Sequence, residues 1–450
     1  MDKKGIGSKC CKMSKAFRII TLGCKVNQYE SASLEESLVS KECRKVGTDG
    51  SADLVIINTC IVTAKASYQS RQAIRRAIRE NPGAIITVTG CYGQVYPDEL
   101  AGIKGVDVIS GNKGKDSLPE IVAHGNHHDP PLVLQEDFGV CYPFEHTKIK
   151  GFGGRTRAFL KVQDGCDCFC SYCIVPRARG PIRSLEPEKV IGDLDDLERN
   201  GYREVVLTGV NLGRYGSDLG KGINLTRLLT EINNKRRALR IRLSSLEPTE
   251  IDRELIALMG TGDLLCRHFH ISLQSGDDSV LRRMNRHYTA EAFTALAKNI
   301  VKQIPRVSIG IDVLVGFPGE TQSAFHNTFS LLEELPVTYM HVFPFSKREG
   351  TAAARFPEQI DNKMIRERAL LLRRLDKQKR KAFWSTLVGD TFQVLTEGWD
   401  PREKNVIRGL SDNYVRFTFS SRKTSTNEMV KIQATKVTEK GINGLPIAEQ

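Results

Sequence analysis

The stretch from Arg157 to Gly180 reads "RAFLKVQDGCDCFCSYCIVPRARG" and puts four cysteines within eight residues, directly after a predicted strand. The four are Cys166, Cys168, Cys170 and Cys173. In a reducing cytoplasm, clustered cysteines indicate a metal, iron–sulfur or redox site rather than disulfide bonds. Which of the four act together therefore separates two classes of protein, an enzyme and a zinc-stabilised binding module.

Strand and helix patterns alternate from this stretch onward. Six apolar segments predict strands at 157–163, 203–210, 239–246, 268–274, 307–316 and 339–345. Helices are expected between them, for example at 187–201, where Val190, Ile191, Leu194 and Leu197 share one face. Six such units predict a partial (βα)6 barrel, and barrels of this type place their chemistry at the carboxyl ends of the strands. The four-cysteine loop follows the first strand, at that end.

Three segments in the first hundred residues also end in a cysteine. "FRIITLGC" ends at Cys24, "ADLVIINTC" at Cys60 and "AIITVTGC" at Cys91, and each is an apolar run typical of a buried strand. Helical patterns follow, most clearly at 66–80, so the segment predicts a parallel α/β sheet. Because the functional crevice of such sheets lies beyond the carboxyl ends of the strands, we expect the three cysteines to converge on one edge.

The rest of the chain completes a prediction of three domains, at 16–130, 152–383 and 386–450. A charged helix is expected from about residue 362, and four short segments at 391–398, 405–411, 414–421 and 429–437 predict a small antiparallel β-barrel. Residues 124–156 lack a sustained period and are expected to form a linker or long connection.

Composition narrows the class of protein. The chain has 450 residues, 66 Lys and Arg against 53 Asp and Glu, and a net charge of +13. This balance fits a polyanionic partner or simply a soluble basic protein. Apolar runs are too short to span a bilayer, and the basic N-terminus lacks the apolar core of a secretory signal. We therefore expect a cytoplasmic protein with no membrane partner.

The spacing within the loop favours an iron–sulfur site. Cys166, Cys170 and Cys173 form C-x3-C-x2-C, and three thiolates on a 4Fe–4S cluster leave one iron free to bind a small molecule. The alternative is a closed tetrahedral zinc site made by all four cysteines, in a non-catalytic RNA-binding protein. That alternative does not explain the three cysteines that end strands in another domain.

The triad after the first strand of a partial barrel resembles the hallmark of the radical S-adenosylmethionine (SAM) superfamily. The resemblance implies a 4Fe–4S cluster on Cys166, Cys170 and Cys173 that binds SAM and cleaves it to a 5′-deoxyadenosyl radical. Cys168 departs from the superfamily, which usually has an amide there, and we interpret it as a non-ligand.

A narrower resemblance covers nearly the whole chain. "TLGCKVNQYES", "INTCIVTAKA" and "TGCYGQ" resemble the N-terminal domain of the methylthiotransferase family, and "LTGVNLGRYG", "RLSSLEP", "HISLQSGDDSVLRRMNRHYT" and "DVLVGFPGET" match its barrel. "HVFPFSKREGTAAA" departs from the common "SPRPGT" form. The resemblance implies a second 4Fe–4S cluster on Cys24, Cys60 and Cys91, and a C-terminal barrel of the RNA-binding TRAM type.

"LGCKVNQYE" resembles the MtaB branch, which implies methylthiolation at C2 of N6-threonylcarbamoyladenosine at position 37 of tRNA. The alternatives are the branches that act on isopentenyladenosine in tRNA or on a ribosomal-protein aspartate. The partners implied are the anticodon arm of tRNA and a low-potential electron donor of the flavodoxin or ferredoxin type. The oligomeric state stays open.

Motif positions also suggest the residues that contact SAM and RNA. The expected SAM contacts, each with plain turn or barrel packing as the alternative, are Tyr172, Thr208, Gly209, Ser245, Glu247, Gln274, Gly316 and Phe317. The expected RNA contacts are Arg71, Arg75 and Arg79 on one helix face, and Tyr414, Arg416, Phe417 and Lys423 in the last barrel, with Phe417 and Phe419 as core residues in the alternative. The residues left without a catalytic or ligand role are His268, His270, His287, Cys10, Cys11, Cys43, Cys141 and Cys266.

Overall fold

The computed structural model describes residues 14–47, 50–139, 142–235, 237–262, 264–421 and 424–447. Two compact units account for its contacts. The first contains Met1–Ile61 and Lys65–Asp137, and the second contains Val62–Ala64 and Phe138–Gln450. Cys10, Cys11, Cys141 and Lys423, which the sequence analysis named, lie outside the described residues. Within the described chain, no helix combines the length and the apolar character that crossing a membrane requires.

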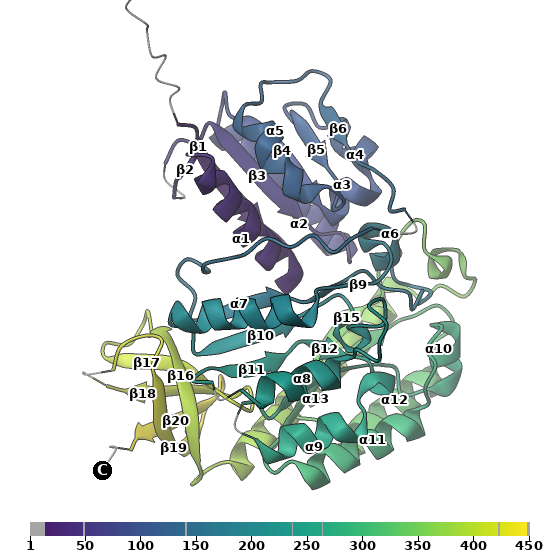
Figure 1. The fold of residues 1–450 in the computed structure, drawn as a ribbon. Helices are drawn as coiled ribbons and strands as arrows, with labels where there is room; N and C mark the ends of the chain where they lie inside the picture. The colour runs from purple at the N-terminus through teal and green to yellow at the C-terminus, as the bar shows by residue number, and fades with distance from the viewer. Residues whose placement is uncertain are drawn as a thin grey trace, which may run out of the picture. The chain divides into compact units, whose positions relative to one another are not determined.

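The first unit is built on one parallel sheet with the order β2-β1-β3-β4-β5-β6 (Figure 1). Its strands are β1 (Ala16–Thr21), β2 (Arg44–Lys45), β3 (Leu54–Thr59), β4 (Ile85–Gly90), β5 (Val108–Ser110) and β6 (Leu132–Leu134). Its helices are α1 (Lys25–Ser40), α3 (Cys91–Val95), α4 (Pro97–Ala101) and α5 (Leu118–Ala123), together with α2 (Ala64–Glu80), which begins in the second unit's short segment. Every residue of β3 and β4 is buried, as expected for central strands covered on both faces.

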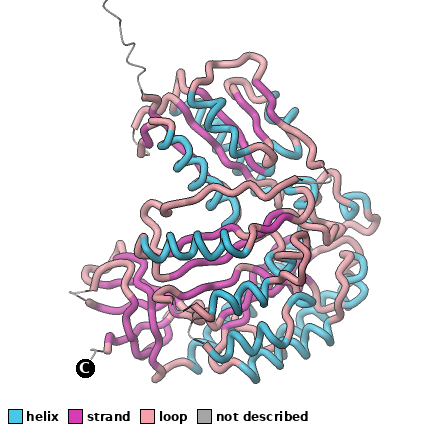
Figure 2. The backbone as a smooth tube through the Cα atoms, viewed as in Figure 1, coloured by secondary structure: helices cyan, strands magenta, loops and turns pink. Residues whose placement is uncertain are grey.

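The predicted parallel sheet is confirmed, and β2, β5 and β6 are additions to the three predicted strands, with β2 and β6 at the edges of the sheet. β6 lies inside the segment expected to be a linker and pairs in parallel with β5. β2 has two residues and pairs with β1. Both strands are too short to show the period that identifies a strand in a sequence. Between β6 and the next strand, which begins at Arg157, the described residues are loop, drawn in pink in Figure 2.

The second unit contains the predicted six-strand partial barrel. Its strands are β7 (Arg157–Lys161), β10 (Glu204–Thr208), β11 (Arg240–Leu243), β12 (Ser245–Leu246), β13 (His268–Gln274), β14 (Ser308–Val315) and β15 (Tyr339–Pro344), and a small pair, β8 (Gln163–Asp164) and β9 (Arg183–Ser184), flanks the first of them. The third predicted strand is broken at Ser244. Its first half pairs with β10 and its second half pairs with β13, so one segment joins a three-stranded sheet to a four-stranded one.

Helices alternate with these strands, as predicted. They are α6 (Val175–Arg179), α7 (Pro187–Arg199), α8 (Leu225–Asn233), α9 (Arg253–Thr261), α10 (Asp278–Arg283), α11 (Ala290–Gln303), α12 (Gln322–Glu334) and α13 (Asn362–Thr386). Several begin with a side-chain cap; for example, Asp252 accepts a hydrogen bond from the backbone N–H of Leu255 at 2.7 Å. The four residues predicted to form the apolar face of α7 are buried.

The C-terminal barrel is closed, with the strand order β16-β17-β18-β20-β19. Its strands are β16 (Thr391–Trp399), β17 (Val406–Ser411), β18 (Arg416–Ser420), β19 (Met429–Val437) and β20 (Ile442–Pro446), drawn in yellow-green to yellow in Figure 1. Four pairs are antiparallel, and β18 with β20 is parallel. A ring of five strands cannot alternate direction throughout, so closure requires one parallel pair. The sequence predicted four of the five strands and an antiparallel barrel.

A buried carboxylate ties this barrel to the core of the second unit. Glu204 on β10 is fully buried and accepts hydrogen bonds from Arg240 and Arg242, each at 2.7 Å. The same two guanidinium groups donate to backbone carbonyls of the barrel, those of Gln393, Leu410, Ser411 and Asp412, at 2.7 to 3.0 Å. Every guanidinium nitrogen of the two arginines therefore donates at least one hydrogen bond, to Glu204 or to the barrel backbone.

Candidate functional site

The three cysteines of the first unit lie at the carboxyl ends of adjacent strands. Cys24 lies in the loop that follows β1 and is the N-cap residue of α1. Cys60 follows β3 directly, and Cys91 follows β4 and begins α3. β1, β3 and β4 are neighbours in the parallel sheet. A Cβ added to Gly23 would lie 2.7 Å from the Cβ and 3.0 Å from the Sγ of Cys60, so the loops that carry Cys24 and Cys60 touch. The expected convergence on one edge is present.

Asparagine side chains fix these loops. The amide nitrogen of Asn27 donates to the carbonyls of Leu22, at 2.8 Å, and Thr59, at 2.9 Å, and so joins the Cys24 loop to the end of β3. The amide of Asn112 lies 3.5 Å from the Sγ of Cys91. Asn27 belongs to the motif "LGCKVNQYE", and its place three residues after a loop cysteine is the sequence signal for this role.

Burial differs among the three thiols. Cys60 and Cys91 are buried, whereas Cys24 is exposed. A group held by all three would therefore rest against the protein on one side and meet solvent on the other. Thiolate sulfur is the donor type that iron–sulfur clusters use, so the residues fit such a group.

The second cysteine loop is held in place by close backbone contacts. Gly165 has φ +76°, and a Cβ there would come within 1.8 Å of the Pro181 carbonyl oxygen, so only glycine fits. The N–H of Cys166 donates to the Gly180 carbonyl at 3.1 Å. On the other side, the N–H of Ser171 donates to the Met284 carbonyl at 3.0 Å. These contacts fix the loop at both ends.

Arg286 is the charged partner of this loop, and the sequence analysis missed it. Its side chain is buried, and its Nη1 donates to the Sγ of Cys170 at 3.3 Å. Its Nη2 lies 2.8 Å from a carboxylate oxygen of Glu247. Arg286 belongs to "MNRHYT", which was quoted as a motif without a role for the arginine. The arginine therefore connects a predicted ligand, Cys170, with a predicted SAM contact, Glu247.

Two cysteines of this loop, Cys170 and Cys173, lie in surroundings that favour the neutral thiol over the thiolate. Burial raises the pKa of Cys173 to about 12. Burial also raises the pKa of Cys170, and the charge of Arg286 only partly opposes it. Both groups are therefore neutral thiols at pH 7 unless a positive centre stabilises their thiolates. Iron in a thiolate-ligated cluster supplies such a centre, so these residues fit the group.

Cys168 has surroundings of its own. A hydrogen bond with Cys166 and burial together raise its pKa. The amide of Asn211 lies 3.3 Å from its Sγ. Over the residues that the structure describes, three metal-ligating atoms come within 4.8 Å of one another at His270, Asp312 and His341, and no set of three loop cysteines does so. Ligands of a single tetrahedral zinc ion lie closer together than that, so this spacing disfavours the closed zinc site.

Three of the expected SAM-contacting residues are brought together beside the loop. The rings of Tyr172 and Phe317 meet edge to face with 6.4 Å between their centroids. Gly316 has φ +77°, and its N–H donates to Glu320 at 2.8 Å. Phe317 is fully buried, where it also contacts Phe345 and Phe356. Its side chain is a core residue, so an adenine contact at this position would use the backbone.

The other expected residues lie at strand ends of the same barrel. Thr208 ends β10, and a Cβ at the following Gly209 would lie 2.7 Å from the amide oxygen of Gln163. The amide nitrogen of Gln163 donates to the Gly165 carbonyl at 2.8 Å. Ser245 begins β12 and is exposed. Gln274 ends β13 at a register shift, with φ +65°. Each of these positions is at the carboxyl end that the fold predicts for chemistry.

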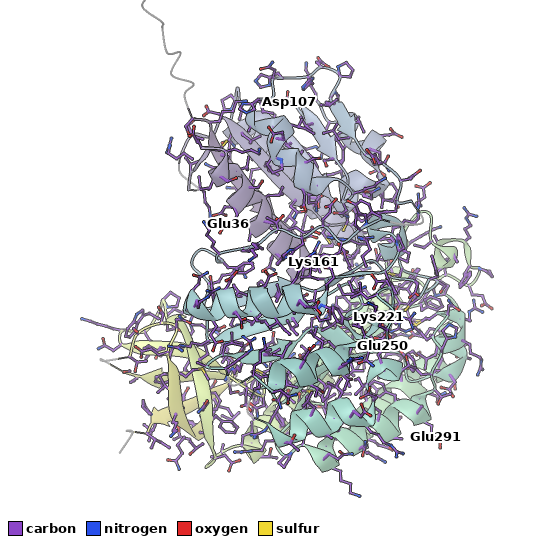
Figure 3. All side chains as sticks on the ribbon, in the orientation of Figure 1. Glu36, Asp107, Lys161, Lys221, Glu250 and Glu291 are labelled. Atoms are coloured by element: carbon purple, nitrogen blue, oxygen red, sulfur yellow. The ribbon has the colours of Figure 1, made fainter. Side chains whose placement is uncertain are left out.

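A second carboxyl group, Glu250, lies close to Glu247 and was not predicted. Figure 3 labels it, together with Lys161 on β7. The backbone N–H of Glu247 donates to Glu250 at 3.2 Å. Burial and the charge of Glu247 raise the pKa of Glu250 to about 7. Burial also raises the pKa of Glu247, the charge of Arg286 opposes this shift, and only Glu247 of the two carboxyl groups has the ion pair with Arg286.

Some of the residues expected to contact RNA are exposed, and others are buried or interact with other side chains of the protein. Arg75 and Arg79 are exposed, whereas Arg71 donates to the hydroxyl of Tyr92 at 2.6 Å. Phe417 and Phe419 are buried in the barrel core, which is the alternative that the sequence left open. Tyr414 stacks on His268 with 4.4 Å between ring centroids. Among the described residues expected in the barrel, Tyr414 is nevertheless exposed, and so is Arg416.

Family models match both units. Residues 16–111 match a family described as "Uncharacterized protein family UPF0004", and residues 160–332 match the radical SAM superfamily. The first match covers Cys24, Cys60 and Cys91, and the second covers the C-x3-C-x2-C loop and Arg286.

Curated relatives cover almost the entire chain. The threonylcarbamoyladenosine tRNA methylthiotransferase MtaB of Bacillus subtilis is 37% identical over 419 residues, which is 92% of this chain and 93% of the relative. The protein of the same name from Aquifex aeolicus is 39% identical over 404 residues, 90% of this chain and 96% of the relative. A tRNA-2-methylthio-N(6)-dimethylallyladenosine synthase from Moorella thermoacetica is 32% identical, covering 94% of this chain and 97% of the relative.

Among solved structures, the radical SAM methyltransferase TsrM from Kitasatospora setae is similar in fold. The TM-score is 0.53 at 17% sequence identity, and the match covers 74% of this chain and 72% of that chain. At this identity the likeness concerns the fold alone.

Proposed function

The chain belongs to the MtaB type of the radical SAM tRNA methylthiotransferase family, and from this premise we propose that two cysteine triads, each holding a 4Fe–4S cluster, let it methylthiolate C2 of N6-threonylcarbamoyladenosine in tRNA. In this proposal Cys166, Cys170 and Cys173 hold one cluster, and Cys24, Cys60 and Cys91 hold the other. Each triad leaves one iron without a protein ligand.

The chemistry of the substrate explains why two such sites are needed. Carbon 2 of adenine has no acidic proton, so a general base alone cannot activate it. When bound, the clusters supply the electron that cleaves SAM and a carrier for the methylated sulfur, neither of which a side chain can supply. The protein's own task is to bind, orient and enclose the reactants.

Arg286 and Glu247 organise the SAM side of the barrel in this proposal. Arg286 bridges the Sγ of Cys170, at 3.3 Å, and the carboxylate of Glu247, at 2.8 Å. A buried guanidinium beside a thiolate stabilises its charged form, and the bridge fixes Glu247 at the strand end where SAM is expected. In this proposal, Tyr172 and the Gly316–Phe317 backbone contact the adenine of SAM.

The proposed partners follow from the substrate and from the charge. The anticodon arm of tRNA is the polyanion that a chain with a net charge of +13 would bind. A flavodoxin- or ferredoxin-type donor would supply low-potential electrons, in a cytoplasmic setting. The single observation that carries the proposal is the identity of 37% and 39% with two MtaB proteins over at least nine tenths of this chain.

The test is nucleoside analysis of tRNA from cells that lack the gene and from cells in which it is restored. We expect 2-methylthio-N6-threonylcarbamoyladenosine to disappear and N6-threonylcarbamoyladenosine to accumulate, with restoration only by the intact chain. A chain with Cys170→Ala serves as the inactive control.

The two nucleoside substrates are separated by the same measurement. Loss of the methylthio group from isopentenyladenosine instead would assign the chain to the other tRNA branch. Unchanged methylthio nucleosides of both kinds would reject the tRNA function.

A further inference from the structure

Three neighbouring strands of the partial barrel direct a row of polar and aromatic side chains to one side. In the parallel register, Asp312 on β14 faces His341 on β15 and Ser272 on β13. Side chains on the opposite faces, such as Ile271 and Ile311, are fully buried. Because successive residues of a strand point to alternate faces, His270 and Ser272 share a side with Asp312 and His341.

Asp312 joins two imidazole rings in this row. Its Oδ1 lies 2.9 Å from the Nε2 of His270 and 3.4 Å from the Nδ1 of His341. The other ring nitrogen of His270 lies 3.1 Å from the hydroxyl of Tyr339. Burial acts to raise the pKa of Asp312, but the hydrogen bonds of His270 and His341 outweigh it and hold the pKa below its usual range. The carboxylate therefore fixes the orientation of both rings.

The row faces the same space as the cysteine loop. The side chain of Ser272 is hydrogen bonded to Glu247, and the charge of Asp312 contributes to the raised pKa of Glu247, whose largest cause is burial. Glu247 is in turn paired with Arg286, which reaches the Sγ of Cys170. A molecule that reacts beside the cysteine loop therefore meets this row.

Within this row of side chains, His341 and Phe343 on β15 are the well-exposed members. The side chain of His341 is 49% exposed, against 10% for His270 and 20% for Asp312. Phe343, two residues further along the same face, is 40% exposed. The rings of His341 and Phe343 meet edge to face with 6.4 Å between centroids. An accessible aromatic ring beside a carboxylate-oriented imidazole is the combination that binds a flat, polar base.

We propose that His341 and Phe343 form the wall that receives the target purine, with Phe343 stacking on the base and His341 hydrogen bonding to it. Asp312 and His270 are positioning residues that hold the His341 ring. The inference deepens the proposed function and rests on it, since it names the residues that meet the nucleoside rather than SAM.

A metal ion is the competing occupant, because the three ligating atoms lie within 4.8 Å of one another. The observations favour the purine. His270 already has partners at both ring nitrogens, and the ring next to His341 is an apolar phenyl group that offers a metal no ligand but offers a base a stacking surface.

The first experiment measures stacking directly. An anticodon stem–loop carrying fluorescent 2-aminopurine at the target position is titrated with the reconstituted full chain. We expect binding to quench the fluorescence in the wild type and in His326→Gln, a control on the exposed histidine of α12. We expect Phe343→Leu, which keeps an apolar side chain but removes the π face, to lose most of the quench. A full quench with Phe343→Leu overturns the proposal, whether or not the RNA is a substrate.

The second experiment separates binding from chemistry. With a threonylcarbamoyladenosine stem–loop, Phe343→Leu and His341→Gln should each raise KM about tenfold, while 5′-deoxyadenosine formation in the absence of RNA stays at the wild-type rate. Asp312→Asn should raise KM and add little when combined with His341→Gln, because it acts through that ring. Unchanged KM values with an active wild type would overturn the proposal.

The two experiments keep the proposals distinct. If the wild type methylthiolates no tRNA, the proposed function fails, and the fluorescence quench alone decides the purine wall. Uptake of one Co²⁺ per chain, with a nitrogen and oxygen ligand-field spectrum that His341→Gln abolishes and His326→Gln preserves, would overturn the wall in favour of a metal site.

Discussion

Cys168 and Cys170 are two residues apart in one loop, yet their surroundings assign them different tasks. Cys170 receives a hydrogen bond from the guanidinium of Arg286 at 3.3 Å, which favours the thiolate. Cys168 is hydrogen bonded to another thiol, Cys166, and lies 3.3 Å from the neutral amide of Asn211. A cationic partner prepares a metal ligand, whereas a thiol and an amide stabilise a neutral group.

This contrast predicts different losses of iron. Cys170→Ala should remove one of the two clusters from anaerobically reconstituted protein, about half of its iron, because the remaining two thiolates cannot replace a ligand. Cys168→Ala should keep nearly all of it. Iron and sulfide analysis with electron paramagnetic resonance of the reduced protein measures both variants. Equal losses would show that Cys168 is also a ligand.

At this scale, the sequence revealed the residues whose spacing is local and missed those whose partners are remote. Three thiols at C-x3-C-x2-C spacing within one loop are enough to predict an iron–sulfur site. Arg286 lies 116 positions from Cys170, and only the packing of β13 and the following turn against the cysteine loop brings them together. Glu250 was missed for a related reason, since its raised pKa comes from burial, which no local pattern reports.

At the scale of elements, Glu204 shows how β10 and β11 hold the C-terminal barrel. Burial acts to raise the pKa of Glu204, but the charges of Arg242 and Arg240 outweigh it and lower the pKa to about 2. A carboxylate with a lowered pKa contributes stability above its unfolded value near 4.5, and that contribution is lost as the pH falls toward 2.

Glu204→Gln should therefore lower the free energy of unfolding by about 3 kcal/mol at pH 7, because it leaves two buried guanidinium groups without their counter-charge. The difference from wild type should shrink steadily below pH 4.5. Denaturant titrations across this pH range test the expectation. Glu397→Gln, which pairs with Arg157 at 2.8 Å in a partly exposed position, is the control and should cost about 0.5 kcal/mol or less. A constant difference from pH 7 to pH 3 would contradict the electrostatic origin.

Element predictions succeeded where a segment carries its own period. β3, β4, β13 and β14 have six to eight residues each and place apolar residues at regular positions, and all four were predicted. β2, β5, β6, β9 and β20 were not. β20 reads "INGLP", with a central glycine and a final proline that weaken strand propensity. It forms because closing the barrel supplies hydrogen-bonding partners on both sides, a condition that exists only in the folded chain.

At the scale of the whole molecule, the positive charge is unevenly distributed. Four of the exposed basic side chains of α13 are Lys363, Arg366, Arg373 and Lys377. Within the described structure, none of the four pairs with a carboxylate. Exposed leucines, Leu370 and Leu371, lie among them. Unneutralised charges repeated along a helix fit a nucleic-acid backbone better than a solvated face rich in ion pairs.

We therefore expect α13 to contribute phosphate contacts. Arg373→Gln combined with Lys377→Gln should weaken tRNA binding and reduce the slope of log K against log salt by about 1.5 to 2 in magnitude, because two counterion-releasing contacts are lost. Lys298→Gln, an exposed lysine on α11, is the control. Binding titrations between low and moderate salt measure the slope. A slope that changes as little as in the control would place the RNA on another surface.

The joint between Glu204 and the last barrel has an evolutionary consequence. Arg240 and Arg242 donate hydrogen bonds both to Glu204 on β10 and to backbone carbonyls of the C-terminal barrel, so the partial barrel and the C-terminal barrel depend on each other. In a chain that ends before β16, the guanidinium groups of Arg240 and Arg242 would lose their acceptors in the C-terminal barrel. Recombination that grafts a foreign RNA-binding module onto this enzyme must therefore recreate four carbonyl acceptors at fixed positions, and the two halves are expected to have been inherited together.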